Sequence, residues 1–182
     1  MPMQELSLNI LDIAENCIKA KATLIEIIVK EDTVKNSLGI TVRDNGSGMT
    51  ADQLASVTDP FFTTRTTRPV GLGVSFFKMT AEMTGGDFSI TSEENQGTTV
   101  VANYKSDHID MLPMGDIIAT IISLITVNPD IDFVYLNEVN DKNFTMDTRE
   151  FREVLEGVPI NSPDVLMYIK GYIEEHQAEI AN

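Results

Sequence analysis

Cysteine and basic side chains are scarce in this chain of 182 residues. The single cysteine, Cys17, excludes an internal disulfide and leaves no cysteine cluster for zinc, which is typical of a reducing compartment. Only 13 basic side chains stand against 28 acidic ones, and the net charge is −15. This balance disfavours nucleic acid and acidic membrane surfaces as partners.

Long hydrophobic runs are also missing. The longest one, around residues 117–127, is too short to span a bilayer. No basic-then-apolar leader opens the chain, so we expect no membrane partner and a cytoplasmic location. The apolar share of 42% is enough for a core. The length suits one domain, or a domain of roughly 100 residues with a smaller appendage.

A glycine-rich turn, Gly71-Leu72-Gly73-Val74, runs into an apolar segment that Gly85 and Gly86 close. Glycines without a Cβ let the backbone approach a polyanion, and the N–H groups that open a helix point at such an anion. Gly85 stands where a helix stops. The pattern indicates either a phosphate cradle or a simple tight turn before a helix.

Residues 3–21 show helical periodicity with a broad apolar face. Opposite this face, at spacings of three and four, run Glu5, Asn9, Asp12, Asn16 and Lys19. The stripe is either a solvated helix face or a functional one. In the functional reading, Asn16 offers an amide oxygen to hydrated magnesium, Asp12 orients or deprotonates a water, and Lys19 faces phosphate.

Residues 23–30 and 39–43 are rich in β-branched side chains and predict a hairpin. The second strand ends in Asp44-Asn45-Gly46-Ser47-Gly48-Met49, which is either a plain turn or a binding element. As a binding element, Asp44 would accept a hydrogen bond from an exocyclic amine, while Gly46 and Gly48 let a flat ring approach the backbone. That combination would select adenine.

Thr50 is a candidate N-cap for a short helix over residues 50–57. The polar, basic loop that follows, residues 59–69, is either a lid over the glycine turn, with Arg65 and Arg68 near phosphate, or a surface loop. Residues 87–91 and 98–104 predict a second hairpin.

The order of these pieces resembles the ATP-binding domain shared by gyrase, Hsp90, sensor histidine kinases and DNA mismatch-repair ATPases, often called the GHKL or Bergerat fold. The resemblance covers about residues 4–104 and is greatest to the histidine-kinase branch. Five segments look like its N box, first glycine box, F box, second glycine box and final glycine box: residues 12–19, 44–49, 59–65, 71–75 and 97–99. The resemblance implies an α+β fold, a two-layer α/β sandwich.

The resemblance also implies roles for single residues. Asn16 would hold magnesium, Asp44 would receive the adenine amine, and Thr98 would support the adenine edge. Lys19 would contact phosphate and, with Asp12, form the catalytic pair. The pocket and lid of an ATP site would be completed by Gly46, Gly48, Met49, Phe62, Thr63, Thr64, Arg65, Gly71, Leu72, Gly73 and Val74.

Two departures from the family pattern bear on the reaction. Asp12 stands where hydrolysing members carry the longer glutamate, so a water placed by that glutamate would lie about one methylene out of reach. No helical hairpin with a phospho-accepting histidine precedes the N box, and His108 and His176 read as surface residues. We therefore expect that any phosphorylation acts on a partner protein.

Residues 106–113 read as a linker, and residues 114–182 read as a small α+β docking or dimerisation module. A helix is expected over 115–126, strands over 132–139 and 143–146, and two further helices, capped by Asp147 with Glu150 and by Ser162 before Pro163.

Three functions stay open from the sequence. The first is a kinase that moves the γ-phosphoryl group of Mg-ATP to a partner protein. The second is a nucleotide-gated binding module similar to the anti-sigma branch. The third is a slow ATPase, a reading that is less favoured because Asp12 stands in place of the longer glutamate. A homodimer is compatible with each of them.

Overall fold

The structure, a computed structural model, describes residues 5–57 and 70–182. Its six strands are β1 (Leu24–Asp32), β2 (Ser37–Asp44), β3 (Asp87–Glu93), β4 (Gly97–Lys105), β5 (Asp132–Val139) and β6 (Lys142–Asp147). The helices of the described residues are α1 (Leu6–Lys19), α2 (Ala51–Val57), α4 (Val70–Met83), α5 (Ile117–Val127), α6 (Thr148–Leu155) and α7 (Pro163–Ala181).

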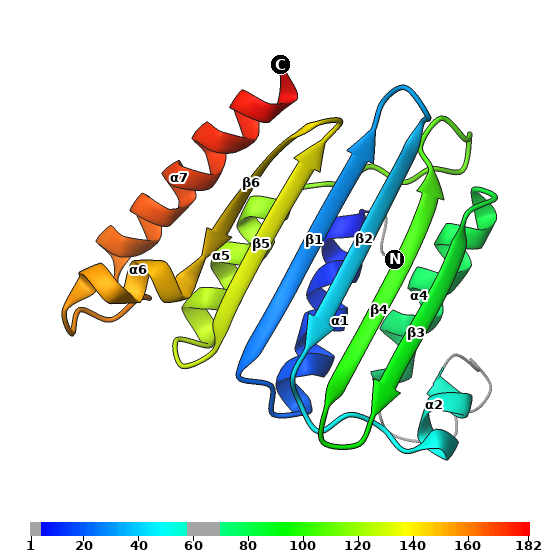
Figure 1. Cartoon of the computed structure of the whole chain (residues 1–182), viewed down its shortest axis with the longest axis horizontal. Coiled ribbons are helices and arrows are strands. Elements are labelled where there is room, and N and C mark those ends of the chain that lie inside the picture. The colour runs from blue at the N-terminus through cyan, green and yellow to red at the C-terminus, as the bar shows by residue number, and fades with distance from the viewer. Residues whose placement is uncertain (1–4, 58–69) are drawn as a thin grey trace.

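The strands form one sheet in the order β3-β4-β2-β1-β5-β6, in which only the β1–β5 pair is parallel among these strands. Figure 1 shows α1, α4 and α5 behind this sheet, with α7 beside the β6 edge. The predicted α+β two-layer sandwich is confirmed, and so are both predicted hairpins.

Alternation along the strands explains why helices cover one face. Ile25, Ile27 and Val29 of β1 are buried, and their neighbours in β1 are more exposed. The strands β2 and β4 alternate in the same way, so their buried side chains lie on the same face of the sheet as those of β1. Helix α1 covers this face with its own buried side chains: Leu6, Ile10, Ile13, Ala14 and Cys17. One apolar layer therefore joins sheet and helices.

Several predicted helix ends are present. Thr50 Oγ1 accepts from the Gln53 backbone N–H, while the Thr50 N–H donates to Gln53 Oε1, which is a reciprocal capping box. Gly85 adopts a φ of +79° two residues after the end of α4, and the Gly86 N–H donates to the Ala81 carbonyl. Asp147 caps α6 by accepting from the Arg149 N–H.

The C-terminal residues share the sheet of the N-terminal ones. Strand β5 pairs with β1 over eight residues from Leu24 to Glu31, and α5 and α7 contribute Ile121, Leu124 and Ile169 to the same core as α1. The N–H groups of Leu6 and Ser7 donate to the carbonyls of Pro113 and Met114. The segment expected to be a linker is thus bonded to the start of α1.

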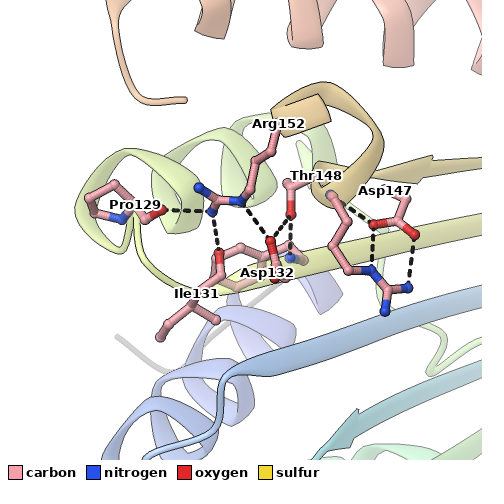
Figure 2. A network of polar contacts seen from close by, with 8 residues as sticks. Pro129, Ile131, Asp132, Asp147, Thr148 and Arg152 are labelled. Carbon is pink, nitrogen blue, oxygen red and sulfur yellow. Dashed lines mark hydrogen bonds and ion pairs between the residues drawn. The ribbon is translucent and has the colours of Figure 1, made fainter. Parts of the chain in front are cut away.

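A polar network holds α6 against the start of β5. Figure 2 shows Arg152 reaching from α6 to Asp132, with Nε donating to Oδ1 at 2.7 Å. The same guanidinium donates to the carbonyls of Pro129 and Ile131, and Thr148 Oγ1 donates to Asp132. These hydrogen bonds fix the turn before β5. The N–H of Asp132, the first residue of β5, donates to the Thr23 carbonyl.

Among residues 5–57 and 70–182, none of the helices combines the length and the apolar character needed to cross a lipid bilayer.

Candidate functional site

Asp44 and Thr98 are register partners where β2 ends and β4 begins. Both follow the alternation of the buried residues Val42 and Val100, so both lie on the face covered by helices. Ser92 is the β3 partner of Thr98, and their hydroxyl oxygens are 2.8 Å apart. Three polar side chains therefore lie in one row at the sheet edge.

The turn after Asp44 is tightly held by its neighbours. Asp44 Oδ1 accepts from the Gly46 N–H at 2.7 Å, and the Ser47 N–H donates to the Ala20 carbonyl at the end of α1. A Cβ on Gly46 would lie 2.6 Å from the Ala20 carbonyl oxygen. The turn places the Asp44 carboxylate beside the C-terminal end of α1.

Gly48 has a φ of +68°, and a Cβ there would lie 1.9 Å from the Glu93 carbonyl oxygen. Glycine is required at this position because the turn packs against the chain's own β3–β4 connection. Met49 follows, and its N–H donates to Ser92 Oγ. The first glycine box is thereby joined to the row of Asp44, Thr98 and Ser92.

Asp44 lies beneath α1 next to Cys17. Burial raises the pKa of the Cys17 thiol well above its usual value, and the negative charge of Asp44 raises it further. The thiol donates to the Ile13 carbonyl. Asp44 is only 8% exposed, so its carboxylate is a nearly desolvated hydrogen-bond acceptor that a ligand amine can satisfy.

Asp12 lies against the first turn of α4. A Cβ on Gly73 would be 2.5 Å from Asp12 Oδ2, so the absence of a side chain at this glycine makes room for the carboxylate. Burial raises the pKa of Asp12, Glu15 raises it further, and Lys19 lowers it. A carboxylate with a raised pKa beside a helix N-terminus is suited to accept a proton near bound phosphate.

The other members of the polar stripe lie along the same helix. Asn16 is half-buried one turn after Asp12, and Lys19 is exposed at the last turn of α1. One amide oxygen and one carboxylate fit a hydrated magnesium ion, which needs few protein ligands. Asn9 is fully buried one turn before Asp12, and neither polar atom of its side chain has a hydrogen-bond partner among the described residues.

Part of the expected site lies outside the described residues or at the start of α4. Phe62, Thr63, Thr64 and Arg65 lie outside the described residues, as does the rest of the expected lid. Gly71 and Leu72 belong to the first turn of α4, and the structure describes the backbone alone there. Val74 is buried at 4% exposure on the same helix and is part of the core.

A hollow of about 270 Å³ borders Asp44 and Thr98, but its lining also includes Arg43, Thr91 and Thr99. These three residues alternate with the buried ones, so they belong to the opposite, uncovered face of the sheet. We place the candidate nucleotide site on the helix-covered side, where the buried carboxylate of Asp44 lies.

Sequence reasoning missed Cys17 and Ser92 as neighbours of the candidate site. Cys17 is a small apolar side chain within the apolar face of α1, and only its position over Asp44 brings it to the site. Ser92 reaches Thr98 through the β3–β4 register. The sequence offered one indication of this contact: Ser92 lies two residues after Ile90, so both side chains are on the same face of β3.

Comparison with known proteins identifies the family of this chain. The family model of the histidine kinase-, DNA gyrase B- and HSP90-like ATPases matches residues 3–108, so the chain belongs to this family. A sensor-like histidine kinase of Rhizobium meliloti is 43% identical over 77 residues, which are 40% of this chain and 15% of that protein. The sensor histidine kinase ZraS of Escherichia coli is 38% identical over 60 residues, 33% of this chain and 13% of that protein.

Among solved structures, the N-terminal domain of a DNA repair protein matches with a TM-score of 0.56 at 15% identity. The match covers 80% of this chain and 53% of that one. Because the identity is low, this likeness shows the fold alone. The aligned stretches span only 15% and 13% of these two curated relatives, so this chain matches a small part of each.

Proposed function

We propose that this protein binds Mg-ATP and transfers its γ-phosphoryl group to a side chain of a partner protein. The observation that carries the proposal is the buried Asp44 carboxylate in a row with Thr98, at the base of the helix whose polar stripe holds Asp12 and Asn16. Family membership supports nucleotide binding at this position.

In this proposal, different residues of the chain bind the adenine, the phosphates and the magnesium ion. Asp44 accepts the exocyclic amine of adenine, and the Thr98 hydroxyl lies beside it. The first turn of α4, with Gly71 and Gly73, offers backbone N–H groups to the phosphates, and Lys19 adds a cation at the end of α1. Asn16 would hold magnesium, which would neutralise phosphate charge when bound.

Asp12 decides between transfer and hydrolysis. Its carboxylate lies against the backbone of α4 at Gly73, on the side of α1 that bears Asn16. In the proposed kinase, this group takes the proton of the accepting side chain. Asp12 is one methylene shorter than the glutamate expected in hydrolysing members, so its carboxylate would reach a free water poorly, and we expect slow hydrolysis in the absence of a partner.

A nucleotide-gated binding module is the second candidate. It is favoured by the contact of Asp12 with the start of α4, because this helix follows directly on residues 58–69 in the chain. Nucleotide bound at α4 would then change the affinity for a partner without phosphoryl transfer. A homodimer would provide such a partner from a second copy of the chain.

The deciding experiment measures ADP release from Mg-ATP by the purified protein alone, with Asp12→Asn beside it. Asp107→Asn is the matched control, because Asp107 is an exposed aspartate after β4, outside the polar stripe of α1. We expect turnover close to background in all three proteins, together with intact ATP recovered from the bound complex.

Clear turnover that disappears in Asp12→Asn and persists in Asp107→Asn would overturn the kinase proposal in favour of an ATPase. If ATP is bound and not hydrolysed, incubation with cell proteins and γ-labelled ATP separates the remaining candidates. Label on a partner supports the kinase. A partner whose affinity depends on ATP, without label, supports the gated module.

A further inference from the structure

A second cavity lies at the opposite end of the sheet from Asp44, between the N-terminal and C-terminal parts of the chain. Its volume is about 350 Å³, within the range of about 300–1,000 Å³ that small-molecule sites occupy. Glu31 of β1 lines this cavity. It lies six residues after Ile25, which is the β1 residue paired with Asp44. The two sites are therefore about 20 Å apart along β1.

The walls of the cavity come from three strands, two helices and the segment between β4 and α5. The floor is the sheet, where Leu38, Glu31 and Val139 are neighbours across β2, β1 and β5. Ile117 of α5 and Ala181 of α7 lie on the helix side, and the segment between β4 and α5 closes it with Met111 and Met114. Methionine side chains adapt their shape easily, which suits a wall that must accommodate a ligand.

A polar group lies within this apolar lining. Asn137 Nδ2 donates to the Tyr135 hydroxyl at 2.7 Å, and that hydroxyl donates to Gln177 Oε1 at 3.1 Å. Burial raises the pKa of Tyr135 to about 12, so its hydroxyl keeps its proton at neutral pH. Asn137 is only 8% exposed, and its Oδ1 has no hydrogen bond to any described residue. This oxygen is an acceptor that a ligand N–H can satisfy.

The charge of the lining selects the ligand class further. Glu31 is the one ionisable carboxylate in it, and neither lysine nor arginine is part of the lining among the described residues. An anionic ligand would face the Glu31 carboxylate, and the described lining offers no cationic side chain to offset that repulsion. A carboxylate and an amide oxygen both favour a ligand that donates hydrogen bonds.

We infer that this cavity is a binding site for a small amine with an apolar body, whose ammonium group faces Glu31 and Asn137 and whose body packs against Met111, Met114 and Ile117. The inference is independent of the proposed nucleotide site. Its test uses the full chain without nucleotide, so its failure leaves the ATP proposal untouched.

Three probes with the same phenyl body test the site: phenethylamine, phenethyl alcohol and hydrocinnamate. Binding is followed by nuclear magnetic resonance of methionine methyl groups, where Met111 and Met114 report on the cavity and Met79 and Met83 of α4 are internal controls. We expect phenethylamine to shift the first pair with a dissociation constant of about 1 mM or below, the range for a ligand of this size. Phenethyl alcohol should bind more weakly, and hydrocinnamate should not bind.

Two variants separate the cavity from the surface. Ala181 is an exposed residue at the rim of the cavity, so Ala181→Phe places a ring across its mouth and should abolish the shifts. Ala178→Phe, the same change at an exposed residue of α7 outside the lining, should keep them. Glu31→Gln should weaken phenethylamine about fivefold, the size of a partly exposed charge pair, and leave phenethyl alcohol unchanged.

The inference is overturned if none of the probes shifts Met111 or Met114 at about ten times the expected dissociation constant. It is equally overturned if hydrocinnamate binds as well as phenethylamine, or if Ala181→Phe folds and still binds. Should Ala181→Phe fail to fold, the wild-type methyl shifts and the Glu31→Gln comparison decide the question.

Discussion

Single side chains carry the argument for nucleotide binding, and Asp44 is the most informative of them. It is 8% exposed, accepts from the Gly46 N–H and lies beside Thr98 and Cys17. Among the described residues this buried carboxylate forms no ion pair, and a hydrogen bond from a ligand amine would offset part of the cost of burying it. Asp44 is therefore expected to show the largest effect of any substitution on adenine recognition.

Replacing Asp44 with asparagine is expected to weaken ADP and ATP binding about 100-fold or more, because an amide presents a donor where the adenine amine requires an acceptor. Isothermal titration calorimetry with ADP measures the effect. Asp107→Asn, at an exposed aspartate after β4, is the control and should bind as the wild type does. Unchanged affinity in Asp44→Asn would refute the adenine assignment.

Asn9 is a buried amide with both polar atoms unsatisfied among the described residues. Replacing it with leucine, which has a similar branched shape, is expected to raise the free energy of unfolding by about 1 kcal/mol, since the cost of the unmet hydrogen bonds disappears. Urea unfolding followed by circular dichroism measures the change. Asn103→Leu is the comparison, because Asn103 is exposed and bonded to Asp87. A loss of stability in Asn9→Leu would show that the amide has partners in solution.

Whole elements depend on their ends, and α6 shows this most clearly. Its N-cap Asp147 accepts hydrogen bonds from the Arg149 backbone and side chain. The side-chain hydrogen bond from Arg149 lowers the pKa of Asp147. A carboxylate whose pKa is lower in the folded chain than in the unfolded one stabilises the fold above the unfolded pKa. That stabilisation is lost as the pH falls through the folded pKa.

Asp147→Ala is therefore expected to lower the free energy of unfolding by about 1 kcal/mol at pH 7, the usual cost of losing an N-cap. The difference between mutant and wild type should shrink as the pH falls below about 4, where the unfolded aspartate begins to take up its proton. Urea unfolding at both pH values tests this. Asp141→Ala, in the exposed β5–β6 turn, should have little effect at either pH. A difference that stays constant down to pH 2 would contradict the assigned cause.

At the scale of the whole molecule, the parallel pairing of β1 with β5 joins two parts of the chain into one sheet. A core that runs from α1 to α7 has no internal boundary along this pair. A ligand bound near Asp44 should therefore also stabilise β5 at the other side of the sheet, because β5 cannot open without exposing β1.

Saturation with ADP at 100 times its dissociation constant is expected to raise the free energy of amide opening by about 2.7 kcal/mol in β2 and in β5 alike. Hydrogen exchange measured by mass spectrometry tests this. The variant Asp44→Asn with the same ADP concentration should show little added protection, about 0.4 kcal/mol or less. If β2 gains protection and β5 does not, the C-terminal residues unfold on their own.

Local chemistry in the sequence was sufficient to predict much of the fold and part of the site. The β-branched runs, the Thr50 cap and the stop at Gly85 are set by near neighbours in the chain, so the hairpins and helix ends followed from them. The spacing of Asp12 and Asn16 along α1 follows from helix geometry. The order of the five motifs was sufficient to predict the ATPase family that the comparisons show.

Tertiary structure alone decided which distant segments meet. The pairing of β5 with β1 unites residues more than a hundred positions apart, and no local pattern in either strand encodes that choice. Three other features depend on how distant segments pack or on strand register. They are the position of Cys17 over Asp44, the hydrogen bond between Ser92 and Thr98, and the cavity behind Glu31. Periodicity determines which side of an element is apolar, whereas the neighbour that covers that side is determined by packing of the whole chain.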